Sequence, residues 1–250
     1  MQHLGHTRSS RQADHMLLTP DTFVRAPLPA MRNATAIVHV SPAMGARFMQ
    51  YTAEFSADGV MPPCEVQRFV YVLEGEINIA GERLGREGYA YFPVGSQTEI
   101  TSAGNARVAV IEKPYMPLPL VPTDQQSSHD HPEDDRMILH FWGRNEHEVK
   151  SQSLGNGLEV RILLPEDPRF DFAVNTMTYQ PGAALPMVES HVMEHGLLML
   201  AGGGIYRLGD HWYPVTAGDF IYMAPWCPQW FGALGPTPAK YLIYKDWNRC

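Results

Sequence analysis

The chain has 250 residues, 44% of them apolar and 18% charged, which is typical of a globular protein with material for one large or two smaller cores. A formal net charge of −8, without any cluster of lysine and arginine, argues against a nucleic-acid partner. No apolar run approaches the ~20 residues of a membrane helix, and the first fifteen residues are too polar for a signal peptide, so we expect no membrane partner and a cytoplasmic protein.

Short segments rich in β-branched and aromatic residues recur along the chain, each bounded by Gly, Pro, Asn or Asp, as is typical of strands. Few windows keep a 3.6-residue apolar period, and 21 glycines with 21 prolines interrupt the chain too often for long helices. We therefore predict a mostly β protein. The clearest strands are expected at residues 34–40, 68–73, 107–111, 158–163 and 241–244.

The chain also repeats itself. The stretch from Phe69 to Gly75 resembles the stretch from Leu197 to Gly202, and a second strand ending in proline follows each of them. The two glycines are 127 residues apart, about half of the chain, which predicts one duplicated domain rather than an array of short repeats.

The segment between the two copies is rich in proline and then acidic, as is typical of a linker. We place the N-terminal copy with its N-terminal arm at residues 1–122, the linker at 123–135 and the C-terminal copy at 136–250. The three cysteines, Cys64, Cys227 and Cys250, are too few for a disulfide framework and fit no zinc ribbon, so we expect simple thiols.

A segment of the second copy carries three side chains that bind divalent metals, Glu189, His191 and His195. Strand residues i and i+2 share a face, so the first two can point together into a barrel. His195 lies four positions further on, about 13 Å away in a straight strand, so the chain must turn between them. We expect that turn at Met193 and Glu194, with His195 opening the next strand.

Each copy has a strand ending in Gly, a hairpin, and a turn leading to a strand ending in Pro, an order that resembles the two motifs of the cupin superfamily. The resemblance implies an all-β bicupin, with two tandem double-sheet jelly-roll barrels. Glu189, His191 and His195 keep the cupin ligand spacing with the residue types permuted. In the second motif, where cupins normally offer a histidine, the available donor is the amide oxygen of Gln229, which favours an oxygen-tolerant ion such as Mn(II).

Two other interpretations of this segment stay open. The histidines and the glutamate can form a hydrogen-bonded turn without a metal. The run from His191 to His195 also matches the H-x-x-E-H pattern of inverted zinc proteases, which requires a helix, but Pro186 and Gly196 flank the run and argue against one. Glu194 is then expected at the surface or behind the ligands rather than as a catalytic base.

The same spacing in the first copy reaches Pro62, Cys64 and Arg68, with Thr98 in the second motif. These residues form no divalent-metal set. We therefore expect the first copy to keep the fold without the metal and to serve in packing and assembly.

Several longer stretches narrow the resemblance to one family, the (S)-ureidoglycine aminohydrolases, which are bicupins also known as glyoxylate-induced proteins. These stretches are Glu189-Ser-His191-Val-Met-Glu194-His195-Gly196, Gly204-Ile-Tyr206-Arg-Leu, Pro228-Gln229-Trp and Tyr241-Leu-Ile-Tyr-Lys245-Asp-Trp-Asn-Arg249. Since Leu17 to Val24 also fits, the resemblance runs from about His15 to Arg249.

The resemblance implies an Mn(II) ion in the C-terminal cupin only, although other divalent metals stay open. Position by position, Glu189, His191, His195 and Gln229 match the metal ligands, while Tyr206, Tyr241 and Lys245 match residues that contact the substrate. Met193 stands where Gln is usual, which bears on fine specificity more than on metal binding.

The implied activity is that of a metal-dependent aminohydrolase, which removes ammonia from the carbon of (S)-ureidoglycine that bears both an amino and a ureido group. The product is ureidoglycolate, in allantoin breakdown. Glu189 and Lys245 are expected to take part in catalysis, the lysine by binding the substrate carboxylate or by moving a proton to the leaving ammonia.

A homo-oligomer is expected because cupin barrels pair through exposed sheet edges. From the implied activity, we expect the binding partner to be a small ureide substrate. Two rival functions stay open: another metal-dependent cupin enzyme, an oxidase, decarboxylase or isomerase acting on a small acid, and a non-catalytic cupin that only binds a small molecule.

Overall fold

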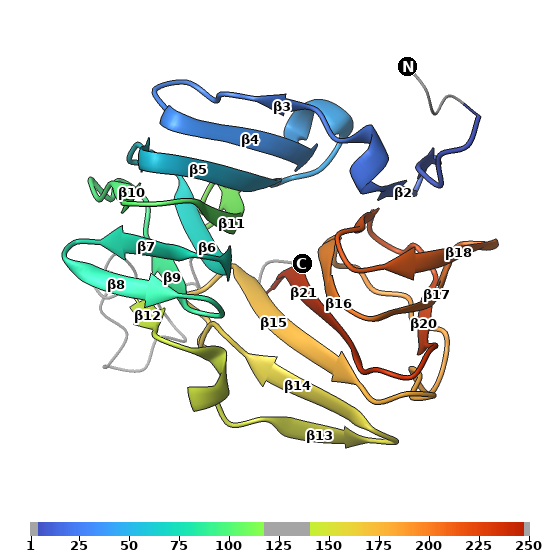
Figure 1. Cartoon of the computed structure of the whole chain (residues 1–250). Coiled ribbons are helices and arrows are strands. Elements are labelled where there is room, and N and C mark those ends of the chain that lie inside the picture. The colour runs from blue at the N-terminus through green and yellow to red at the C-terminus, as the bar shows by residue number, and fades with distance from the viewer. Residues whose placement is uncertain (1–4, 118–140, 248–250) are drawn as a thin grey trace, which may run out of the picture.

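The structure is a computed structural model, and it describes residues 5–117 and 141–247. Its regular structure is antiparallel strand, which confirms the predicted all-β class (Figure 1). Within the described ranges the helical turns are of the 3-10 type: η1 (Pro20–Thr22), η2 (Pro42–Met44) and η5 (Glu146–Glu148). Among these residues there is accordingly no helix with the length and apolar character needed to cross a membrane.

The first barrel is a single curled sheet built mainly from the N-terminal half of the chain. Its strands are β3 (Arg25–Ala26), β4 (Arg32–Val40), β5 (Met49–Met61), β6 (Gln67–Glu74), β7 (Glu76–Ile79), β8 (Glu82–Gly85), β9 (Tyr89–Phe92), β10 (Ile100–Ser102), β11 (Ala106–Lys113) and β12 (Phe141–Gly143). The long β5 pairs with β11 over its first half and with β10 at its end, which closes the sheet around an apolar interior.

The second barrel combines an eight-stranded sheet with a three-stranded sheet. The larger sheet contains β1 (Ser10–Arg11), β2 (His15–Leu18), β13 (Gln152–Gly155), β14 (Leu158–Ile162), β15 (Phe172–Tyr179), β16 (His195–Ala201), β19 (Phe220–Met223) and β21 (Ala239–Asp246). The smaller sheet contains β17 (Gly203–Leu208), β18 (His211–Thr216) and β20 (Gln229–Ala233). All five strands expected from the sequence are present: four lie within β4, β6, β11 and β21, and the segment 158–163 matches β14 except for its last residue.

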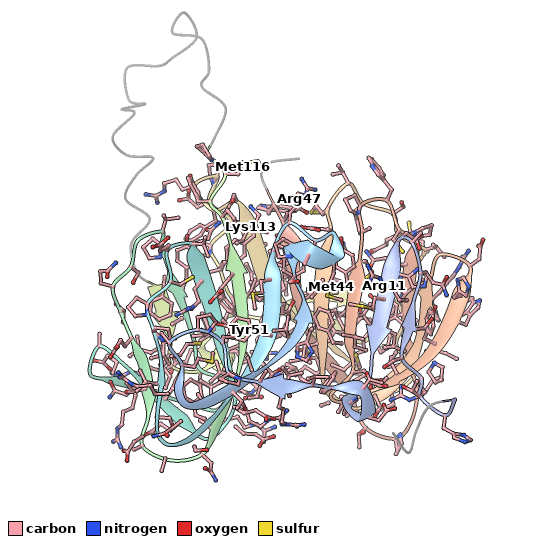
Figure 2. The ribbon with its side chains drawn as sticks, turned by 90° about the horizontal axis from the view of Figure 1, so that it is seen from above. Arg11, Met44, Arg47, Tyr51, Lys113 and Met116 are labelled. Carbon is pink, nitrogen blue, oxygen red and sulfur yellow. The ribbon has the colours of Figure 1, made fainter. Side chains whose placement is uncertain are left out.

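The sheet of each barrel includes a strand from the other half of the chain. The N-terminal strand β2 pairs with β19 of the second barrel. Strand β12, which belongs to the second half of the chain, pairs with β9 of the first barrel. In Figure 1 the blue arm that carries β2 lies against the orange and red strands, and Figure 2 places Arg11 of β1 among them. The predicted linker, 123–135, and the boundaries at 122 and 136 lie outside the described residues, so the division into domains stays a prediction.

The duplication is visible in the glycines that end equivalent strands. Gly75 follows β6 and Gly202 follows β16, and both have a positive φ, of 74° and 62°. A Cβ atom would lie 2.3 Å from the carbonyl oxygen of Asn105 at the first position and 2.4 Å from that of Pro238 at the second. In both copies the same backbone turn packs against the start of the equivalent strand, β11 in the first copy and β21 in the second. Both copies therefore require glycine there.

A third apolar core joins the outer faces of the two sheets, and it is rich in aromatic side chains. The ring of Phe48 from the first barrel stacks on Tyr244 of β21, with centroids 3.9 Å apart, and both residues are fully buried. Burying one such side chain contributes about 1.5–3 kcal/mol, so this interbarrel core makes the two barrels one body.

Ion pairs within and around the interbarrel core complete the contact. Lys113 of β11 binds the buried carboxylate of Asp171, and Arg47 binds Asp246 of β21 with nitrogen and oxygen 2.9 Å apart. Lys240 of β21 reaches Glu146, 2.5 Å away. Figure 2 shows Lys113 and Arg47 along the side where the two barrels meet. Removing one member of such a pair would leave a buried charge, so the pairs fix how the barrels dock.

Replacing Gly196 with alanine tests this docking. A Cβ atom there would lie 2.2 Å from Oε1 of Gln50 and 2.7 Å from the ring of Phe48, across the interbarrel core. We expect Gly196→Ala to lower the free energy of unfolding by about 1–3 kcal/mol through overpacking. Gly104→Ala is the matched control, because no heavy atom lies within 4 Å of the position that its Cβ would take. Urea unfolding followed by tryptophan fluorescence measures both, and equal stability of the two variants would contradict the docking described here.

Candidate active site

A cavity of about 320 Å³ opens into the second barrel. Its walls come from β13 to β17, β20, β21 and the loop between β15 and β16. All seven residues predicted for the site line this one cavity: Glu189, His191, His195, Tyr206, Gln229, Tyr241 and Lys245.

Backbone pairing holds two of the predicted ligands face to face. Glu189 and Gln229 form an isolated β-bridge in which each amide donates to the other's carbonyl oxygen at 2.8 Å. The amide of Trp226 donates to the carbonyl oxygen of His191 at 2.6 Å. The loop that carries Glu189 and His191 is therefore fastened along the segment that leads into β20.

The chain bends at residues 192–193 and β16 begins at His195, where the sequence places the start of a strand. His195 lies opposite Lys245 in the register of β16 and β21. Alternation along β21 puts Tyr241, Ile243 and Lys245 on the cavity face. The intervening Leu242 and Tyr244 belong to the interbarrel core.

The predicted ligands gather loosely. Nε2 of His191 lies 3.2 Å from Oε2 of Glu189, and the rings of His191 and His195 stand edge to face with centroids 5.5 Å apart. The metal-binding atoms of Glu189, His191 and His195, all within the described residues, do not all come within 4.8 Å of one another. All of these side chains line one cavity, and those of Glu189 and His191 are partly exposed.

The electrostatics of His195 suit a metal ligand. Burial lowers the pKa of His195 to about 3, and the Coulombic interactions with Lys245 and His191 act in the same direction. Its imidazole is therefore neutral, the form that binds metals. Its buried Nε2 has no hydrogen-bond partner. An imidazole nitrogen left without a partner beside a carboxylate and an amide oxygen fits a divalent ion.

Lys245 is partly buried on the same wall. Burial lowers the pKa of its amine, and the carboxylates of Glu189 and Glu166 act against that shift. An ammonium group held in a confined space near two carboxylates can bind an anionic substrate group and can also release its proton more readily than a solvated lysine.

The tyrosines of the site form two hydrogen bonds deep in the cavity. The hydroxyl of Tyr206 donates to Oε1 of Gln229 at 3.2 Å, so it orients the predicted amide ligand. The hydroxyls of Tyr241 and Tyr179 lie 2.7 Å apart. Tyr179 was not predicted from the sequence, although it shares strand parity with Met177 and Asn175 of β15.

Sequence reasoning also missed polar residues on the strands next to β21 in the same sheet, where Asn175 pairs in register with Ile243. Asn175 of β15 lines the cavity and is only 8% exposed, and its Oδ1 has no hydrogen-bond partner. Glu166 and Gln152 also line the cavity. The signal that would have found Asn175 is a lone polar residue at an inward position of a strand.

Glu194 does not lie at the surface, which was one of the two positions expected for it. It is 1% exposed and points into the contact between the barrels, where it accepts hydrogen bonds from the backbone amide of Arg47 at 3.0 Å and from the hydroxyl of Tyr222 at 3.2 Å. The expectation of a surface position was wrong, because the strand that begins at the next residue turns this side chain away from the cavity and towards the first barrel. It therefore cannot serve as the base of a zinc protease.

The equivalent place in the first barrel holds a protein cation instead of metal ligands. Arg68 pairs in register with Glu112, as His195 pairs with Lys245. Its guanidinium donates to Glu112 Oε1 at 2.8 Å and to the carbonyl oxygen of Pro62 at 2.7 Å, and the side chain is buried. The buried guanidinium of Arg68 neutralises the carboxylate of Glu112, which is therefore not left to bind a metal ion.

Comparisons with known proteins agree with this geometry. The family model described as "Cupin domain" matches residues 175–244, which include all four predicted ligands. The chain is 38% identical to (S)-ureidoglycine aminohydrolase from Arabidopsis thaliana, over 98% of this chain and 80% of the relative.

This chain belongs to the (S)-ureidoglycine aminohydrolase family.

A bacterial member of this family, from Escherichia coli strain K12, is 28% identical over 96% of this chain and 90% of its own length. A crystal structure solved as a glyoxylate induced protein from Pseudomonas aeruginosa aligns with a TM-score of 0.82 and 26% identity, covering 98% of this chain and 92% of that one. The family predicted from the sequence is thus confirmed, and the bicupin fold with it.

Proposed function

We propose that this chain is a manganese-dependent hydrolase that releases ammonia from (S)-ureidoglycine and forms (S)-ureidoglycolate in purine catabolism. One observation carries the proposal: a single cavity collects a carboxylate, two imidazoles, an amide and a lysine amine in a chain of this family. The activity comes from the family, and the cavity supplies groups that suit it.

Glu189, His191, His195 and Gln229 would hold the metal ion. Two imidazoles with two oxygen donors and no thiolate suit Mn(II), although other divalent ions also accept such a set. When bound, the ion would act as a Lewis acid and as an anchor for the carboxylate or amine of the substrate.

The net reaction replaces a carbon–nitrogen bond with a carbon–oxygen bond. Water displaces the amino nitrogen at the carbon that bears the ureido group: a carbon–oxygen bond forms and the carbon–nitrogen bond breaks. The water gives up one proton, and the amino nitrogen takes one up and leaves as ammonia. Lys245 on the cavity wall can supply this proton, because its amine is partly buried and its pKa is lowered by that burial. The same amine, while charged, would bind the substrate carboxylate.

Asn175 would accept a hydrogen bond from the ureido group. A ureido group offers several N–H donors, and Oδ1 of Asn175 is a buried acceptor without a partner on the same cavity. Tyr206 and Tyr241 would complete the substrate wall, Tyr206 also by fixing the amide of Gln229. Met193 lines the cavity and would affect which ureides fit.

The proposal has two further parts, the assembly of the protein and its location in the cell. A homo-oligomer is supported by exposed apolar side chains in the loops before β16 and β20, among them Met187 at 65% and Trp226 at 65% exposure. A cytoplasmic location is supported by Cys64 and Cys227, which are both free thiols.

Ammonia release from freshly generated ureidoglycine tests the function. The protein as purified should release ammonia, chelated protein should fall to the rate of a buffer-only control, and added Mn(II) should restore the rate. Circular dichroism of the chelated protein checks that the fold survives. Oxygen uptake without ammonia release would support a cupin oxidase instead, and binding of ureidoglycine without turnover would support a binding protein.

Two glutamine substitutions test the assignment of the two nearby glutamates. Glu189→Gln removes a charged ligand and should weaken manganese binding at least ~10-fold with little change in stability. Glu194→Gln should keep the metal but lower the free energy of unfolding by about 1–3 kcal/mol, because it disturbs buried hydrogen bonds to Arg47 and Tyr222. Metal content after dialysis and urea unfolding measure the two effects. The opposite pattern would place Glu194 at the metal and refute the assignment.

A further inference from the structure

A second group of metal-binding side chains lies outside the cavity, where the N-terminal arm docks on the second barrel. It consists of Asp14 and His15 of the arm and Cys227 of the loop before β20. One ligand atom from each residue lies within 4.8 Å of the others. We propose that these three side chains bind a zinc ion that fastens the arm to the second barrel.

His15 is oriented as a metal ligand requires. Its side chain is buried, with Nε2 2.9 Å from the hydroxyl of Tyr213 and Nδ1 2.8 Å from Oδ1 of Asp14. When Nε2–H donates to Tyr213, Nδ1 is left with its lone pair facing the carboxylate and the thiol. A ligating histidine usually donates its other ring N–H to an oxygen in this way, which fixes the ring.

Backbone hydrogen bonds bring Cys227 to the arm. The amide of Ala224 donates to the carbonyl oxygen of Asp14 at 2.8 Å, and the amide of Cys227 donates to the carbonyl oxygen of Ala224 at 3.2 Å. Cys227 is 3% exposed. The loop and the arm therefore hold their ligands together without any metal, which lowers the ordering cost of binding one.

The ligand types select zinc. A thiolate, an imidazole and a carboxylate are all ligands of Zn(II), whereas Mn(II) prefers oxygen donors and disfavours thiolate. The two negative ligands would balance the charge of the ion. The side chain of Asp14 is 45% exposed, so water can reach the site from that side and supply a fourth, tetrahedral ligand. The ligand set proposed for the cavity differs, because it contains no thiolate.

The position of the site gives the ion a structural role. The arm crosses to the second barrel and pairs there through β2 with β19, and Cys227 lies two residues before the predicted ligand Gln229. A zinc ion would fasten the exchanged strand beside the segment that leads to the cavity. This inference stands independently of the proposed hydrolase activity.

Cobalt substitution tests the site directly. In full-length protein with both Cys64→Ser and Cys250→Ser, Cys227 is the remaining cysteine, because the chain has three. After chelation and loading with Co(II), this variant should show a thiolate-to-cobalt charge-transfer band in the near ultraviolet. Added Zn(II) should abolish the band, whereas added Mn(II) should not.

Further substitutions separate the site from the cavity. Adding Cys227→Ser should remove the band and one bound zinc per chain, and His15→Gln should weaken zinc binding at least ~10-fold, while manganese content stays unchanged in both. Absence of the band in the variant that keeps Cys227 would overturn the proposal, even if the other variants fail to fold. Asp14, His15 and Tyr213 would then form only a hydrogen-bonded chain.

Discussion

The structure depends on the alternation of one strand, β21, whose two faces serve two different environments. One face presents Tyr241, Ile243 and Lys245 to the cavity, while the other buries Leu242 and Tyr244 in the interbarrel core. The neighbouring strand β16 does the same with His195 and Gly196. The first barrel therefore packs against the opposite face of the two strands that carry His195, Tyr241 and Lys245, and it fixes their position. A one-residue shift in register would exchange the two faces, so docking and site geometry are set together.

This arrangement shows what the first barrel contributes to the sheet that carries the site. The first barrel contributes Phe48, Gln50 and Arg47 to the back of the site-bearing sheet, and it places the Arg68–Glu112 pair where the second barrel has His195 and Lys245. The reciprocal exchange of β2 and β12 ties the halves further, because neither barrel completes its sheet with its own half of the chain. In the duplicated fold, the second barrel carries the candidate site and the first barrel supports the sheet that holds it. A single barrel would have to do both.

Much of this was predictable because the signals are local. Strand positions follow from short apolar runs, and the spacing of Glu189, His191 and His195 places them at one turn. What could not be predicted depends on contacts between distant residues. The exchanged strands are two to four residues long and pair with the other half of the chain, and Glu194 is buried because Arg47, 147 positions away, donates to it. The polar wall at Asn175 was missed because a lone asparagine in a strand carries no spacing signal.

The central claim is that one divalent ion binds in the cavity of the second barrel between Glu189, His191, His195 and Gln229. Anomalous X-ray scattering from crystals soaked in Mn(II) tests it most directly. The account predicts a manganese peak within coordinating distance of those four side chains and none beside Arg68 in the first barrel. A map without a peak between the four side chains, or with manganese bound only elsewhere, would contradict it.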